Sequence, residues 1–140
     1  MDAFDSDVLI YAVVPGHELG RRVRALFPSE PVATTGTLVG VGSVLLLPEV
    51  LTKPVRTGAD LELRALTSLL GCLDLRPVDA ATARLATALG GSYGLRAADA
   101  VHLATAVQAG AERFITNNRA DFDTHIAEVE VTYPSELPDP

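Results

Sequence analysis

Residues 95–122 read LRAADAVHLATAVQAGAERFITNNRADF, a run that predicts a helix, then a strand, then a polar turn. The alanine-rich part, Ala97–Ala109, has the composition of a helix and carries Asp99 in its first turn. The apolar run Phe114–Thr116 that follows is short enough to be a buried strand. A helix that leads directly into a strand is typical of an α/β domain with a parallel sheet.

The rest of the chain continues this alternation of strands and helices. Residue patterning predicts further strands at Ala3–Asp5, Val32–Thr34, Leu73–Leu75 and Val129–Thr132. It predicts further helices at Asp7–Val13, Glu18–Phe27, Thr37–Leu51, Gly58–Leu70 and Ala80–Leu89. We therefore expect a three-layer α/β/α sandwich with a mostly parallel central sheet, and ligands beyond the carboxyl ends of its strands.

Length and composition indicate one ordinary globular domain over residues 1–140, with 48% hydrophobic and 21% charged residues. The longest apolar stretch, residues 37–51, is interrupted by glycine, proline and Glu49, so we expect no membrane span. The first seven residues hold three aspartates and no basic residue, which argues against a secretory signal and favours the cytoplasm. Cys72 is the only cysteine, so no intramolecular disulfide is expected.

The net charge of −7 argues against a broad electrostatic grip on nucleic acid, because non-specific affinity comes from cations that neutralise phosphates. A bound metal ion would supply local positive charge that this count omits. Lys53 is the only lysine, and Arg21, Arg22 and Arg24 form the one local basic cluster. The simplest interpretation of that cluster is a solvated helix face.

Polar residues stand where the predicted strands end. Asp5 closes the first strand, Thr116 and Asn118 end the fourth, and Asp99 opens the helix before it. Carboxyl ends of parallel strands share one edge of the sheet, so we expect these residues to meet there. Each alone is equally typical of a helix cap or a turn, so the joint pattern carries the interpretation.

Three segments together resemble the PIN-domain nucleases, and in particular the VapC-like toxins of type II toxin-antitoxin systems. They are FDSDVLIYA at residues 4–12, SVLLLPEVLTKP at residues 43–54, and the run at residues 95–122. The resemblance extends over essentially the whole chain. Its most specific part is the third segment, where an aspartate opens an alanine-rich helix, a histidine follows three residues later, and a strand ends in threonine.

The resemblance implies a catalytic metal site formed by Asp5, Glu49 and Asp99, with Ser6 and Thr116 at its two hydroxyl positions. It implies Mg²⁺ or Mn²⁺ as cofactor, single-stranded RNA as substrate, an antitoxin protein as partner, and a homodimer. The chemistry agrees, because Mg²⁺ needs oxygen ligands and can activate water for phosphodiester hydrolysis.

The chain departs from the family pattern at Asn118, where these nucleases usually have a fourth acid. An amide offers an oxygen ligand without charge, which weakens metal binding and predicts reduced activity. Asp7 lies close to the same expected site. Either Asp7 supplies the negative charge that Asn118 lacks, or Asp7 is an ordinary acid at the start of a helix. Asp121 and Asp123 are further candidate donors, although solvated loop acids are the simpler interpretation. His102 lies one turn after Asp99, where it could hydrogen-bond that carboxylate or act as a structural histidine.

Two other functions fit parts of the sequence. Asp5-Ser6-Asp7-Val8 matches the opening motif of haloacid-dehalogenase-like phosphatases, but the preceding strand is short and Lys53 is the only lysine available for catalysis. Alternatively, Asn118 and the acidic surface fit a PIN scaffold that has lost catalysis and acts as a binding module.

Overall fold

Five short strands form one parallel sheet in the computed structural model, which describes residues 1–29, 36 and 38–140. Their order across the sheet is β3-β2-β1-β4-β5, and every neighbouring pair is parallel. The strands are β1 (Asp2–Phe4), β2 (Gly40–Ser43), β3 (Leu73–Arg76), β4 (Arg113–Ile115) and β5 (Glu130–Thr132). The sheet thus places β1 at its centre.

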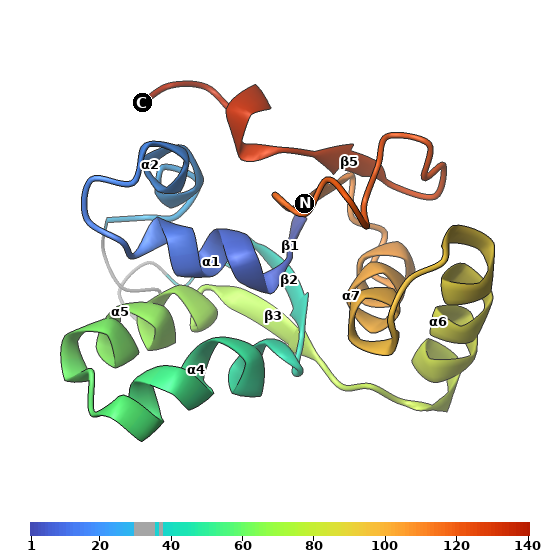
Figure 1. Ribbon diagram of the computed structural model, residues 1–140, viewed down its shortest axis with the longest axis horizontal. Helices are drawn as coiled ribbons and strands as arrows, with labels where there is room; N and C mark the ends of the chain where they lie inside the picture. The colour runs from blue at the N-terminus through green and yellow to red at the C-terminus, as the bar shows by residue number, and fades with distance from the viewer. Residues whose placement is uncertain (30–35, 37) are drawn as a thin grey trace.

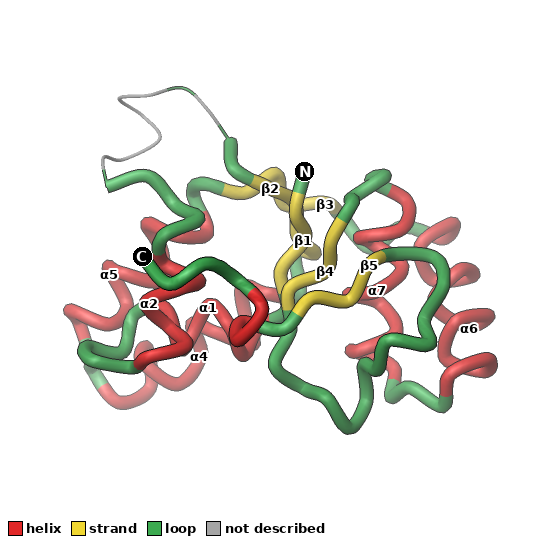
Figure 2. Tube along the Cα trace, turned by 90° about the horizontal axis from the view of Figure 1, so that it is seen from above, coloured by secondary structure: helices red, strands yellow, loops and turns green. Residues whose placement is uncertain are grey.

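Helices cover both faces of this sheet. One face carries α1 (Ser6–Ala12), α2 (Glu18–Arg24), α4 (Leu46–Thr57) and α5 (Asp60–Leu70), and the other carries α6 (Ala80–Tyr93) and α7 (Ala97–Gln108) (Figures 1 and 2). A short 3₁₀ helix, η1 (Pro134–Glu136), follows β5. The predicted three-layer α/β/α sandwich is confirmed. No helix in the described part of the chain is long and apolar enough to cross a bilayer.

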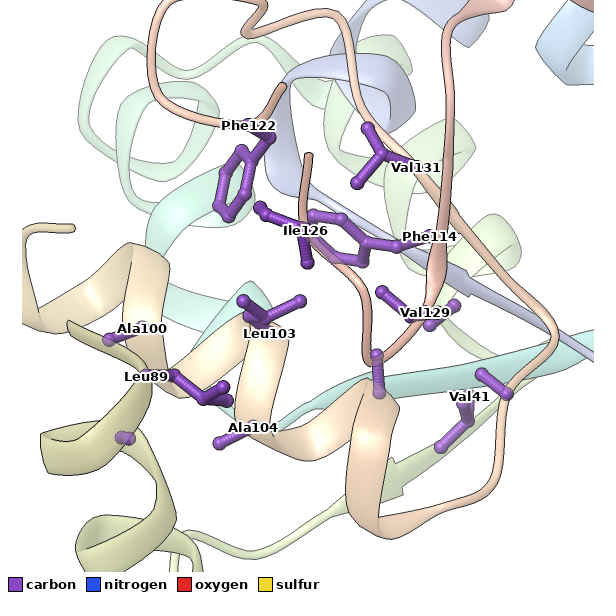
Figure 3. Close-up of a cluster of buried hydrophobic side chains, with 14 of the residues drawn as sticks. Val41, Leu89, Ala100, Leu103, Ala104, Phe114, Phe122, Ile126, Val129 and Val131 are labelled. Atoms are coloured by element: carbon purple, nitrogen blue, oxygen red, sulfur yellow. The ribbon is translucent and has the colours of Figure 1, made fainter. Parts of the chain in front are cut away.

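Alternating residues of the strands feed two separate cores. Ala3 and Phe114 point into the cluster beneath α6 and α7, while Phe4 and Ile115 point into the cluster beneath the other helices. Figure 3 shows the first cluster, in which Phe114 meets Phe122 edge-on with ring centroids 4.9 Å apart. Because side chains alternate between the faces of a strand, three or four residues suffice to anchor both helical layers.

The chain reverses its direction across the sheet next to β1. From β1 the chain continues to β2 and then to β3 at one edge of the sheet. It returns through the helices α6 and α7, and β4 then pairs with the other side of β1. At the start of these two strands Arg113 makes a bidentate ion pair with Asp2 at 2.8 Å. At their carboxyl ends the Asp5 N–H donates to the Ile115 carbonyl at 3.0 Å. This second end is a topological switch point, where α/β domains commonly bind ligands.

The predicted helix over residues 37–51 is wrong in its first half. Gly40–Ser43 forms the fully buried strand β2, and the helix, α4, begins only at Leu46 and continues to Thr57. A Cβ atom at Gly40 would lie 2.4 Å from the Asp2 carbonyl oxygen, so glycine permits the close approach of β1 and β2. The predicted strand Val32–Thr34 lies outside the described residues. The other elements lie at the predicted places with shifted ends; α6, for example, continues to Tyr93.

Candidate active site

Asp5 lies at the switch point, directly after β1, where it caps the start of α1. Its carboxylate is buried, and both oxygens accept hydrogen bonds: Oδ1 from the Ser6 backbone N–H and Oδ2 from the Thr116 hydroxyl, each at 2.8 Å. Burial raises the pKa of Asp5 because the charged form loses hydration, although the nearby His102 and the Thr116 bond oppose this shift. Ser6 makes this contact through its backbone N–H and Thr116 through its hydroxyl.

Asp7 lies two residues later, in the first turn of α1. Its Oδ2 accepts a hydrogen bond from the Asn117 N–H at 3.1 Å, whereas its buried Oδ1 has no partner among the described residues. Burial, and then the negative charge of Asp5, raise the pKa of Asp7 to about 7. Asp7 is therefore an under-coordinated carboxylate beside Asp5.

Asp99 approaches the same place from the first turn of α7. Burial raises its pKa, followed by the charges of Asp5 and Asp121. Asp5, Asp7 and Asp99 thus form a cluster, which we call the acidic centre, in which the carboxylates disfavour one another's ionisation.

Glu49 reaches this region from α4 and forms a hydrogen-bonded pair with His102 of α7. Burial lowers the pKa of His102, but the hydrogen bond and charge of Glu49 outweigh it, so the net shift is upward. The sequence offered Asp99 as the hydrogen-bond partner of His102, and the structure corrects this to Glu49. His102 Nε2 pairs with Glu49 of α4, which covers the opposite face of the sheet, and the charge of His102 lowers the pKa of Asp99.

Asn118 makes its side-chain contacts with Asp121. The Asn118 amide donates to Asp121 Oδ2 at 2.9 Å, and the Asp121 N–H donates back to Asn118 Oδ1 at 3.3 Å. The Asn118 N–H also donates to the Thr116 hydroxyl at 3.1 Å, which links this loop to Asp5. The negative charge of Asp121 also raises the pKa of Asp99. The sequence pattern alone did not indicate this interaction. The exchange of charge between Asp7 and Asn118 stays a prediction.

The donor chemistry of the acidic centre fits a hard divalent cation. All its side-chain donors are carboxylate oxygens, one of them buried without a partner, and a cation would relieve the repulsion that raises their pKa values. Within the described residues, however, no group of three or more His, Cys, Asp or Glu side chains is arranged so that it could hold a metal ion. Glu49 lies outside the acidic centre as defined here, and its carboxylate is paired with His102.

A cavity of about 590 Å³ lies elsewhere, between the end of α1 and the end of α2. Its lining includes Val13, Pro15, Arg21 and Phe27 but none of the acidic residues described above. This cavity is therefore separate from the acidic residues at the switch point.

Comparison with known proteins agrees with this geometry. The PIN domain family model matches residues 3–126. A structure of a toxin-antitoxin complex from Klebsiella pneumoniae superposes with a TM-score of 0.73 at 25% identity, covering 98% of this chain and 100% of that one. No curated protein matches significantly.

Two further structures share the fold at lower identity. FitAcB from Neisseria gonorrhoeae gives a TM-score of 0.71 at 21% identity over 98% of this chain and 100% of that one. VapBC2 from Rickettsia felis, bound to a DNA fragment from its promoter, gives 0.66 at 15% identity over 94% and 97%. The family model covers most of the sequence, and the parallel five-stranded sheet with helices on both faces matches the fold of these structures. The chain belongs to the PIN domain family.

Proposed function

We propose that this protein is a Mg²⁺- or Mn²⁺-dependent endoribonuclease that hydrolyses phosphodiester bonds of single-stranded RNA, as the toxin of a toxin-antitoxin pair. PIN domains are generally nucleases, and one similar structure is a toxin-antitoxin complex. The observation that carries the proposal is the acidic centre, where the pKa values of Asp5, Asp7 and Asp99 are all raised at the switch point. We also propose that the protein acts in the cytoplasm.

Asp5 and Asp99 are the residues we assign to hold the metal, together with Glu49. A divalent ion there would lower the pKa of a bound water and neutralise charge that develops on the phosphodiester. Because the pKa of Asp7 is raised to about 7, an ion that binds beside it near neutral pH would displace a proton from part of the Asp7 population.

The surrounding residues hold these carboxylates in place. The Ser6 N–H and the Thr116 hydroxyl fix the two oxygens of Asp5, so its side chain cannot rotate away from the switch point. His102 fixes Glu49, and Asn118 fixes Asp121. Such orientation by neighbouring groups is what metal-binding carboxylates require.

Cleavage of a labelled single-stranded RNA with Mn²⁺ tests the proposal. We expect Asp5→Asn and Asp99→Asn to lower the rate by at least about a hundredfold, a loss typical of a removed electrostatic group. Asp60→Asn, an exposed acid on α5, is the matched control and should cleave normally.

Equal activity in all these variants would refute the assignment of the site. Metal binding without cleavage of any RNA would favour the alternative of a PIN scaffold that acts as a binding module. Membership of the PIN family removes the support for a haloacid-dehalogenase-like phosphatase.

A further inference from the structure

We propose that Arg119 forms a phosphate-binding subsite at the rim of the acidic centre and holds the backbone of the RNA strand there. The inference rests on the proposed nuclease function and extends it to how the substrate is positioned. It follows from the place of Arg119 in the chain, from the contacts that hold its guanidinium, and from the donors that those contacts leave free.

The backbone of Arg119 lies beside the acidic centre. Its N–H donates to the Asn117 carbonyl at 3.0 Å, and the Asn117 N–H in turn donates to the carboxylate of Asp7. Consecutive Cα atoms are about 3.8 Å apart, so the Cα of Arg119 is within about 8 Å of that of Asn117. From this position the side chain extends to Tyr133 and Ser135, which directly follow β5 at the carboxyl end of the sheet.

The guanidinium of Arg119 is held in one place. Its carbon lies 4.0 Å from the centroid of the Tyr133 ring, and its NH2 group donates to the Ser135 hydroxyl at 2.8 Å. The ring cannot swing away, because the buried Tyr133 hydroxyl donates to the Phe122 carbonyl at 2.7 Å. An arginine that is already ordered loses less conformational entropy when it binds a ligand.

Most of the hydrogen-bonding capacity of Arg119 remains free. In the part of the chain that the structure describes, it pairs with no carboxylate and uses one N–H group, on Ser135. Arg113 and Arg76, by contrast, are engaged by Asp2 and Asp74. An exposed guanidinium with several free donors matches the oxygens of a phosphate group.

A second arginine approaches the same segment. Arg22 of α2 donates through NH1 to the carbonyls of Ser135 at 3.3 Å and Leu137 at 2.7 Å. Arg22 and Arg119 therefore contact the carbonyl and the hydroxyl of the same residue, Ser135, and two like charges near one residue favour a bound anion. In a chain of net charge −7, this is local positive charge beside an acidic centre that otherwise repels phosphate.

These observations favour a contact with the nucleic-acid backbone. The Tyr133 ring is buried and one of its faces is covered by Arg119, so it offers no surface on which a base could stack. Phosphate contacts position a strand without selecting its sequence. Arg119 thus fixes where the strand lies relative to the carboxylates, while base preference must come from other residues.

Fluorescence anisotropy with a short labelled oligouridine tests the subsite, using Asp99→Asn as a background in which cleavage is expected to be at least about a hundredfold slower. We expect Arg119→Ala to weaken binding by about tenfold, and to reduce the slope of log affinity against log salt by about 0.7, the value for one contact with a single-stranded phosphate. Arg119→Lys retains the charge but not the planar fork, so it should keep the slope and lose about threefold in affinity. Arg64→Ala, an exposed arginine on α5, controls for the change in net charge.

Affinity and salt slope for Arg119→Ala that equal those of Arg64→Ala would overturn the subsite. Thermal melting shows whether Arg119→Ala remains folded; if it does not, Ser135→Ala removes the anchor alone and should weaken binding with an unchanged slope. If the wild type cleaves RNA but Arg119→Ala does not change RNA binding, the subsite alone is refuted. Arg119-dependent binding without any cleavage refutes the nuclease only, and no binding by any variant refutes both.

Discussion

Glu49 on α4 and His102 on α7 pair with each other, although their helices cover opposite faces of the sheet. His102 is 2% exposed, and the charges of Asp5 and Asp99 add to the hydrogen bond and charge of Glu49 in raising its pKa. The outer layers are thus joined directly beside the acidic centre, and the geometry of Glu49 depends on a residue 53 positions away in the sequence.

His102→Ala should lower the free energy of unfolding by about 2–4 kcal/mol, because it leaves a cavity and removes the partner of Glu49. His125→Ala, at an exposed histidine, should change it by no more than about 0.5 kcal/mol. Urea unfolding at pH 7 measures both, and an equal effect in the two variants would show that the pair contributes nothing to stability.

Mn²⁺ binding should depend on Asp5 and Asp99. Calorimetry should detect binding to the wild type that Asp5→Asn or Asp99→Asn weakens by at least about tenfold, a loss of about 1.4 kcal/mol. Asp60→Asn is the control, since this exposed acid lies on α5. Unchanged affinity in both site variants would contradict the assignment.

The stability of the metal-free protein should show the raised pKa of Asp7. Its folded-state pKa of about 7 lies above the ordinary value of 3.8, so the folded state binds more protons in this window. The contribution of Asp7 to the free energy of unfolding therefore falls as pH rises from about 4 to above 7. One pKa unit corresponds to about 1.4 kcal/mol, so the effect is on the order of a few kcal/mol.

Asp7→Asn removes this titration and should gain stability over the wild type as pH rises through that window. Denaturant unfolding of both proteins at several pH values, without divalent ions, measures the difference. A difference that does not change with pH would contradict the prediction. Saturating Mn²⁺ should reduce the difference, because the ion favours the charged carboxylate.

Asn118→Asp should bring a new carboxylate against Asp121 and lose the amide donor between them. We expect this variant to be less stable without metal and to bind Mn²⁺ more tightly. In a double-mutant cycle, Asp121→Asn should couple to Asn118→Asp by more than about 0.5 kcal/mol, as expected of residues in contact. A parallel cycle with Asp7→Asn tests the exchange of charge between Asp7 and Asn118, and additive effects there would end that hypothesis.

The chain should form a homodimer in solution, as its family resemblance implies. Light scattering at concentrations up to about a hundred micromolar should give twice the chain mass. The reason is that the dissociation constant of a specific dimer is usually below that concentration. The mass of one chain at every concentration would contradict this prediction.

The sequence was a good guide where local pattern and topology agree. Asp5, Asp99 and Thr116 stand at the ends of elements whose periodicity is clear, and parallel strands bring such ends together. Strand β2 was missed because the run Gly40–Ser43 has low intrinsic strand propensity and precedes a leucine-rich helix. Only its two strand neighbours, and the space that glycine leaves, make it a strand.

The partners of His102 and Asn118 were beyond sequence reasoning for a different reason. Helical spacing indicates which residues share a face, but not which residue of another helix faces them. The pairing of His102 with Glu49 depends on how α4 and α7 are placed by the sheet between them. The bond between Asn118 and Asp121 depends on the path of a loop that has no periodicity.

The hydrogen bond between Thr116 and Asp5 also bears on how the protein is made. It joins positions 111 residues apart, and β1 gains β4 as its neighbour only when that late segment is present. Synthesis proceeds from the N-terminus at about 5–20 residues per second, so the nascent chain lacks Thr116 until most of it has been translated. A growing polypeptide therefore cannot assemble the acidic centre in this form until the segment that carries Thr116 has emerged.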